Sequence, residues 1–109
     1  MFMEVEKVKV TDHYLKRSKE RMNLCAKKAE RVANLAYWRG YRAKDCKKAC
    51  DIRFLESKSF PEIYHEAVAY NGYCFIIDFE SRLVLTVYPL PEYFGKKYIQ
   101  SRKAMLFSY

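Results

Sequence analysis

The dipeptide Asn71-Gly72 constrains this chain more than any other local feature, because it joins two runs that are typical of β-strands. A two-residue hairpin turn needs positive φ at both central positions, and Asn-Gly supplies them at little cost. The run that follows, YCFIIDF from Tyr73, is apolar on both faces, as expected of a central strand. The sequence therefore predicts a β-hairpin whose first strand covers residues 63–70.

Two further strands are expected. The run RLVLTVY at residues 82–88 is rich in β-branched side chains and follows a short turn. Pro89 and Pro91 then end it, because proline cannot donate to a strand ladder. Near the start of the chain, valines alternate with lysines, which predicts a short edge strand over residues 4–10.

Helical spacing of apolar residues predicts the remaining elements. The predicted helices cover residues 12–22, 25–39, 44–57 and about 91–106. Thr11 is placed to cap the first helix, Asn23 to end it in a left-handed conformation and Gly40 to stop the second. We expect one α+β domain over residues 1–109, in the order β-α-α-α-β-β-β-α. Its helices would pack on one face of a small antiparallel β-meander.

The positive charge is concentrated in the first half of the chain. Residues 1–50 hold 14 Lys/Arg and 6 Asp/Glu, which gives 14 − 6 = +8, whereas residues 51–109 hold 7 of each. Such asymmetry favours an anionic partner, namely a nucleic acid, a nucleotide signal or an acidic protein surface. The alternative is that solvated helices carry lysines for solubility. The first interpretation requires the cations of the first three helices to form one continuous surface.

Three groups of side chains are candidates for binding or chemistry. His13, Arg17 and Arg21 recur at i, i+4 and i+8, so they share one helix face, and Lys28 and Arg31 follow on the next helix. Guanidinium groups suit phosphate oxygens and a histidine can move protons, although the arginines could instead pair with neighbouring glutamates. The other two groups are tyrosines, which stack on bases or fill a core, and the cations of the last helix. Their members are Tyr64, Tyr70, Tyr73, Tyr88, Tyr93 and Tyr98, and Lys96, Lys97, Arg102 and Lys103.

Several classes of protein are disfavoured. No apolar run is long enough to span a bilayer and the first residues lack a signal-peptide pattern, so we expect a cytoplasmic protein without a membrane partner. The four cysteines are expected to be reduced, and their spacing matches no zinc motif. There is no glycine-rich phosphate loop and no Ser-His-Asp spacing. We expect no cofactor and no metal. Any chemistry would use His, Lys, Arg and Tyr, a set that suits metal-independent RNA cleavage.

Three stretches resemble a set of small phage and prophage proteins. VTDHYLKRSKERMNL is similar to their opening helix motif, Thr-x-His-Ala-x-x-Arg-x-x-x-Arg, with Tyr14 here in place of the alanine. KKAERVANLAYWRG resembles their second helix, and YNGYCFIIDFESRLVLTVYPLP resembles their closing hairpin. The resemblance covers about half the chain, in the same order. It implies a mobile-element protein that acts in a bacterial host cell.

More distantly, the layout is similar to the RelE and BrnT superfamily of ribonuclease toxins. That resemblance nominates His13, Arg17 and Arg21 and makes Arg82 and Tyr88 worth testing. The candidates for catalysis are His13, Arg21 and Tyr88, and the catalytic residues stay unassigned. The residues proposed for binding are Arg17, Arg21, Lys28, Arg31, Arg82, Lys97 and Arg102. Two hypotheses follow. The first is a non-enzymatic binding protein that engages an anionic partner and inhibits a host defence system. The second is a toxin endoribonuclease. A homodimer stays open under both.

Overall fold

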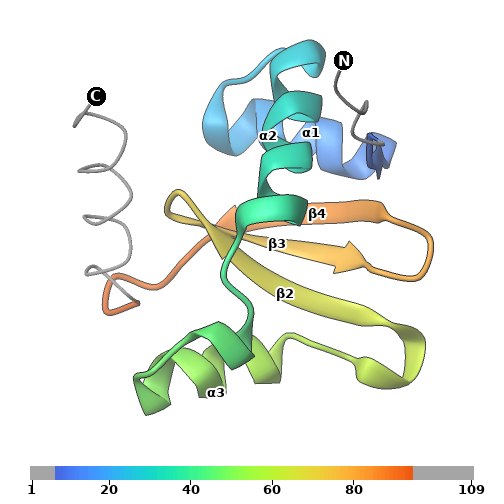
Figure 1. Ribbon diagram of the computed structural model, residues 1–109. Coiled ribbons are helices and arrows are strands. Elements are labelled where there is room, and N and C mark those ends of the chain that lie inside the picture. The colour runs from blue at the N-terminus through green and yellow to red at the C-terminus, as the bar shows by residue number, and fades with distance from the viewer. Residues whose placement is uncertain (1–6, 95–109) are drawn as a thin grey trace, which may run out of the picture.

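The computed structural model describes residues 7–94 and shows an α+β fold built around a four-stranded sheet (Figure 1). The elements follow one another in the expected order, with two 3-10 helices, η1 and η2, added on either side of α3. Their bounds are β1 Lys9–Val10, α1 Asp12–Met22, α2 Ala26–Arg39, η1 Ala43–Asp45, α3 Ala49–Ser57, η2 Pro61–Ile63, β2 His65–Tyr70, β3 Tyr73–Asp78 and β4 Leu83–Pro89.

The sheet has the strand order β1-β4-β3-β2. Strands β2, β3 and β4 form the predicted antiparallel meander, whose first turn has φ 52° at Asn71 and 87° at Gly72. Strand β1 instead pairs with β4 in parallel, with Lys9 opposite Leu83. The sheet is therefore mixed, and the expectation of a wholly antiparallel sheet was wrong. The helices α1, α2 and α3 lie between β1 and the meander in the chain, so no tight turn fixes the direction of β1.

A bulge in β4 decides which side chains face α1. Ile76 lies opposite Thr86 but Ile77 lies opposite Val84, so Leu85 is an extra residue in the ladder. Strict alternation would send Val84 and Val87 to opposite faces, yet both are fully buried in the same core cluster. The bulge also presents the carbonyl of Leu85 to Thr11, whose hydroxyl donates a 2.8 Å hydrogen bond to it.

The first core lies between the sheet and the α1–α2 pair. Phe75 and Ile77 of β3 are fully buried against the small side chains Ala29, Ala33 and Ala36 of α2. Tyr14 of α1 is also fully buried, and its hydroxyl donates a 2.7 Å hydrogen bond to the carbonyl of Ala29. That bond satisfies the only polar atom of the tyrosine side chain and fixes α1 against α2.

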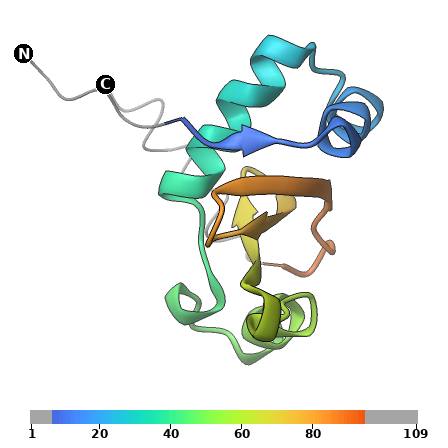
Figure 2. The same cartoon turned by 90° about the vertical axis from the view of Figure 1, so that its right-hand side faces the viewer.

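The second core lies on the other face of the sheet, beneath η1 and α3 (Figures 1 and 2). Leu55 of α3 packs there with Ala67 and Ala69 of β2, Cys74 of β3, and Phe94. The expectation that all helices share one face was therefore wrong for α3. The reason is that β2 and β3 are apolar on both faces, so each face needs a cover.

The bounds of α1 agree with the sequence prediction, whereas the segments predicted as the third and the last helix differ from it. Thr11 caps α1 by accepting from the backbone N–H of Tyr14, and Asn23 ends it with φ 56°. The segment expected as a helix over 44–57 divides into η1 and α3, because the Asp45 carboxylate accepts from the backbone N–H of Arg42 and closes a tight turn. Residues 91–94 form a turn, and the rest of the expected last helix lies outside the described residues.

Candidate functional site

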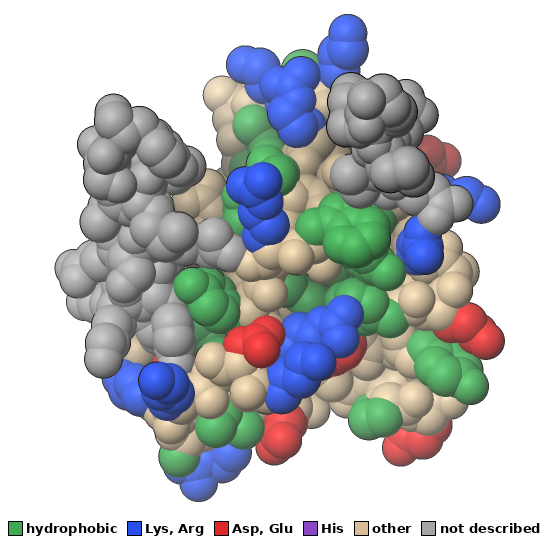
Figure 3. All heavy atoms as spheres, viewed as in Figure 1, with side chains coloured by type: hydrophobic (Ala, Val, Ile, Leu, Met, Phe, Trp, Pro, Cys, Tyr) green, Lys and Arg blue, Asp and Glu red, His purple; other side chains and the backbone are tan. Residues whose placement is uncertain are grey.

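Within the described residues, the excess of positive over negative charge lies on one side of the sheet. Residues 11–39, which form α1, α2 and their connection, hold eight Lys/Arg and three Asp/Glu, which gives 8 − 3 = +5. Residues 40–94 hold seven and eight, which gives −1. We call residues 11–39 the basic layer. In Figure 3 the top of the molecule, over α1 and α2, carries mainly Lys and Arg side chains, whereas acidic and basic side chains mix below it.

Five cations of the basic layer are exposed and make no ion pair within the described residues. They are Lys16, Lys19, Lys27, Lys28 and Arg31. Lys16 and Lys19 border a shallow hollow of about 570 Å³ between the end of α1 and the start of α2. Exposed cations on two adjacent helices form a surface that can contact several phosphates at once.

The start of α2 adds to the positive potential of this layer. Cys25 stands at its N-cap, and the first turn contains no acidic residue. The backbone N–H of Lys28, followed by that of Lys27, stabilises the thiolate and holds the pKa of Cys25 below its ordinary value. The backbone N–H groups at the start of a helix favour negative charge there.

The predicted stripe on α1 is only partly available for binding. His13 is exposed. Arg17 instead pairs with Glu20 at 2.7 Å, which is the alternative that the sequence left open. Arg21 donates from Nη1 to the backbone carbonyl of Val87 at 2.5 Å, so its guanidinium holds α1 on the sheet.

The three residues nominated for catalysis do not meet. Tyr88 follows Val87 on β4, so the two side chains point to opposite faces of the sheet. The side chain of Tyr88 packs in the second core, beneath α3. Burial raises the pKa of Tyr88, and Cys74 lies beside its hydroxyl. His13 and Arg21 stand on α1, on the other face. The structure therefore does not assemble a His13–Arg21–Tyr88 site.

The other residues proposed for binding are dispersed. Lys28 and Arg31 lie in the basic layer, whereas Arg82 has φ 56° in the β3–β4 turn, where its carbonyl accepts from the N–H of Lys9. Lys97 and Arg102 lie outside the described residues.

The expectation that the cations of the first three helices form one continuous surface was wrong, so an anionic partner is left with the cations of α1 and α2 alone. The cations of η1 and α3 lie across the sheet from the basic layer, because α3 covers the second core. They are Lys44, Lys47, Lys48, Arg53 and Lys58.

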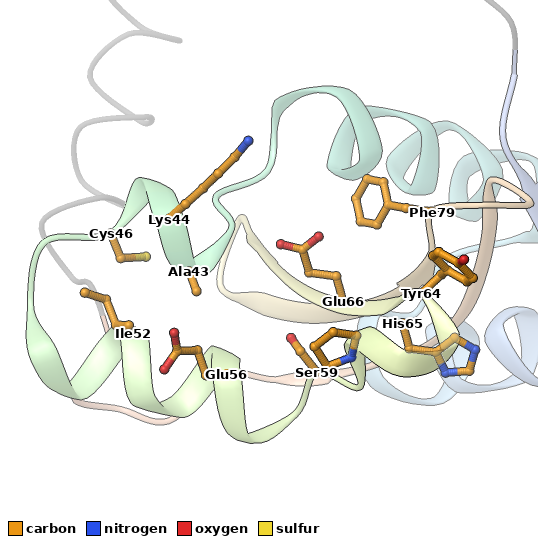
Figure 4. A pocket seen from close by; sticks show the side chains of 11 residues that line it. Ala43, Lys44, Cys46, Ile52, Glu56, Ser59, Tyr64, His65, Glu66 and Phe79 are labelled. Atoms are coloured by element: carbon orange, nitrogen blue, oxygen red, sulfur yellow. The ribbon is translucent and has the colours of Figure 1, made fainter.

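A groove that the sequence did not predict lies between β2 and the η1–α3 segment (Figure 4). Its volume is about 630 Å³. Arg42 sits 3.8 Å from the centre of the Phe79 ring and 3.8 Å from the Glu66 carboxylate, while His65 Nε2 lies 3.7 Å from Asp78 Oδ2. One signal was present in the sequence: residues 59–81 contain four acids and no Lys or Arg, in a chain that is otherwise rich in cations.

Comparison with protein-family models, curated proteins and solved structures returned no match.

Two kinds of site are absent from residues 7–94. They contain no group of three or more His, Cys, Asp and Glu side chains that could hold a metal ion. None of the helices in this range has the length and apolar character needed to cross a bilayer. The basic layer and the groove are thus the two features of the described fold that offer chemistry to a partner.

Proposed function

We propose that this protein binds a nucleic acid through the basic layer, without catalysing a reaction on it. The observation that carries the proposal is the +5 charge of residues 11–39, which includes five exposed cations that lack an ion pair within the described residues. Cations that make no ion pair stay available to an external polyanion, because no carboxylate holds them in a salt bridge.

A nucleic acid fits the basic layer better than the other anionic partners considered. The cations are spread over two helices beside a shallow hollow, whereas a single nucleotide would need a deeper pocket. Among the described residues, Trp38 at the end of α2 is the first large apolar side chain that is strongly exposed. For an acidic protein partner, the basic layer would offer a single exposed apolar anchor, Trp38, whereas protein interfaces use a cluster of them.

The mode of binding follows from the same surface. Trp38, at the end of α2, is the only large aromatic ring that residues 11–39 strongly expose, so at most one base has a platform on which to stack. Contacts would go to phosphates, which carry no sequence information. We therefore propose a binding that depends on charge density and salt, and hardly on base sequence.

The biological role that we propose rests on the resemblance of three segments to small phage proteins. A protein that covers a nucleic acid through its backbone can hide it from a host enzyme that must reach the same phosphates. Inhibition of a host defence system is thus a role in which binding alone is sufficient.

Fluorescence anisotropy with labelled duplex and single-stranded oligonucleotides tests the proposal. The affinity should fall roughly 100-fold between about 50 mM and about 200 mM NaCl if about four phosphates are contacted. Lys28→Glu with Arg31→Glu should weaken binding at least about tenfold. The matched control, Lys48→Glu with Arg53→Glu, makes the same change in net charge on the α3 side and should have a much smaller effect.

Three outcomes would count against the proposal. A salt-independent affinity, or equal losses in both double variants, would remove the basic layer as the binding surface. Binding of a mononucleotide in preference to an oligonucleotide would point to a nucleotide signal instead. Growth arrest and RNA cleavage on expression in a bacterium, relieved by His13→Ala, would favour the ribonuclease hypothesis.

A further inference from the structure

Three large apolar side chains within five residues face solvent beside the groove. Phe60, Ile63 and Tyr64 are 54%, 53% and 56% exposed, although the second core lies close by. We call the segment 60–64, which contains η2, the η2 surface. Scattered apolar residues are ordinary on a protein surface, but a cluster rimmed by charges is typical of an interaction site.

The backbone holds this cluster outward at a cost. The N–H and carbonyl of Phe60 both bond to His65, at 2.8 and 3.1 Å, and the N–H of Tyr64 donates to Pro61 at 3.1 Å. Tyr64 has φ 61°, which is unfavourable for a residue with a bulky side chain. A rigid and strained loop that displays apolar groups is better explained by binding than by folding.

Within residues 59–81 the charged side chains are acidic, whereas Lys58 precedes this stretch and Arg42 and Lys44 lie at the groove. All four charged residues between 59 and 81, apart from His65, are carboxylates: Glu62, Glu66, Asp78 and Glu80. Glu62 and Glu80 make no ion pair within the described residues. Figure 3 shows acidic side chains flanking hydrophobic ones at the lower right of the molecule. The acidic rim would repel a nucleic acid and attract a cationic partner.

The groove next to this surface can receive a cationic side chain. Tyr64 belongs to the lining of the groove as well as to the η2 surface. Figure 4 shows Glu56 reaching into the groove from α3 and Glu66 from β2, with Lys44 on the η1 side. Arg42 already lies over the Phe79 ring beside Glu66, so a guanidinium is compatible with this aromatic and acidic lining.

We propose that the η2 surface and the groove together dock a segment of a partner protein that carries apolar anchors flanked by Lys or Arg. The apolar anchors pack on Ile63 and Tyr64, and a cation enters the groove between Glu56 and Glu66. A second copy of this chain is the less suitable occupant. Its basic layer offers cations, but Trp38 is the only large apolar side chain that residues 11–39 expose, so this layer has no apolar cluster to cover Ile63 and Tyr64.

A panel of synthetic peptides tests this surface directly. Each peptide combines apolar residues with Lys and Arg, and each is paired with a version in which Glu replaces every Lys and Arg. Binding to the full chain is followed by NMR chemical-shift changes. At least one basic peptide should bind at least about tenfold more tightly than its acidic version and shift the amides of residues 60–66.

Matched variants distinguish binding at the η2 surface from non-specific binding to exposed apolar side chains. Ile63→Ser with Tyr64→Ser should weaken the best basic peptide at least about tenfold. Tyr93→Ser removes another exposed aromatic side chain, 52% exposed, and should change the affinity by less than about twofold. Glu56→Gln with Glu66→Gln should weaken the basic peptide while leaving the amide spectrum of the fold intact.

Each contrary result overturns the proposal. Equal binding of basic and acidic versions, unchanged affinity in the Ile63/Tyr64 double variant, or no binding by any basic peptide would each do so. A concentration-dependent dimer that the same double variant converts to a monomer would assign the surface to a second copy of this chain.

Discussion

Gly40 packs directly against Val68, so that a Cβ atom at position 40 would overlap the valine side chain and lie 2.6 Å from the carbonyl oxygen of Ala36. Gly40 ends α2 as expected, but its φ is −71°, which any residue can adopt. What demands glycine here is therefore space, at the point where the chain leaves α2 and crosses β2. The N–H of Tyr41 then bonds to the carbonyl of Ala69 at 2.8 Å.

Gly40→Ala should lower the free energy of unfolding by about 3 kcal/mol, because both the Val68 side chain and the Ala36 carbonyl must move. Gly72→Ala is the matched control: a Cβ there meets nothing within 4 Å, but φ is +87°. It should cost about 1 kcal/mol, from backbone strain alone. Urea denaturation measures both values. A smaller loss for Gly40→Ala than for Gly72→Ala would contradict the packing described.

The contrast between these two glycines shows which parts of the fold the sequence can predict. The turn at Asn71-Gly72 depends on local backbone preference, which two adjacent residues specify. The close approach of Gly40 to Val68, the parallel direction of β1 and the bulge at Leu85 depend on contacts between residues far apart in the chain. Which face of the sheet α3 covers also depends on such long-range contacts, because β3 is apolar on both faces and each face could accept a helix.

Cys25 should be much more reactive than Cys46 and Cys74. Cys25 is exposed, and its pKa is held below its ordinary value by backbone N–H groups at the start of α2, that of Lys28 first. Burial raises the pKa of Cys46 and of Cys74 to about 11. At about pH 8 the thiolate fraction of Cys25 should thus be much larger than theirs.

Iodoacetamide should therefore alkylate Cys25 before Cys46 and Cys74 in the native protein. Mass spectrometry of peptides from timed samples measures the rates, and Cys25→Ser should abolish the fast phase. The rates for Cys46 and Cys74 should rise with pH up to about 11, about tenfold per pH unit. Labelling of Cys74 as fast as Cys25 in the folded chain would contradict the burial of the second core.

Asp78 should couple stability to acid pH. Its Oδ1 accepts from the backbone N–H groups of Ser81 and Glu80, at 3.1 and 3.0 Å. The Ser81 N–H first, and the nearby His65 to a lesser degree, hold the pKa of Asp78 below its usual 3.8. Because the folded pKa is the lower one, the stabilisation is complete above about pH 4 and is lost as the pH falls through the folded value.

Asp78→Asn keeps an oxygen that can accept both hydrogen bonds and removes the titration. The wild-type protein should melt at a higher temperature than this variant near pH 6, and the difference should shrink as the pH falls toward about 2.5. Glu62→Gln is the control, since its carboxylate accepts no hydrogen bond from the described residues. A difference in melting temperature that stays constant with pH would exclude the proposed linkage.

The candidate sites were predictable only in outline. The cationic first half predicts an anionic partner, which stays a prediction, and the structure places a net charge of +5 on residues 11–39, which form α1, α2 and their connection. The stripe at i, i+4 and i+8 correctly places Arg17 and Arg21 on one helix face, but spacing cannot show that Glu20 and the Val87 carbonyl engage them. The sequence indicates the η2 surface only weakly, through an acidic stretch over residues 59–81 that contains no Lys or Arg.

Substitutions of Arg21 and Lys28 should distinguish a residue that stabilises the fold from one that contacts the nucleic acid. Arg21 ties the end of α1 to the sheet through the carbonyl of Val87, and its own carbonyl accepts from the Tyr73 hydroxyl at 3.1 Å. Arg21→Ala should lower the free energy of unfolding by about 1 kcal/mol, because a charged donor is removed from a partly buried carbonyl. Lys28→Ala, at an exposed site, should change it by less than about 0.5 kcal/mol.

Oligonucleotide binding should respond in the opposite order. Lys28→Ala should reduce the slope of log affinity against log salt by about one, as expected for the loss of one phosphate contact. Arg21→Ala should reduce it less, because part of that guanidinium is committed to Val87. Anisotropy titrations and urea denaturation of the same two variants supply both measurements. If Arg21→Ala abolished binding while leaving stability unchanged, Arg21 would belong to the partner's site and the bond to Val87 would be incidental.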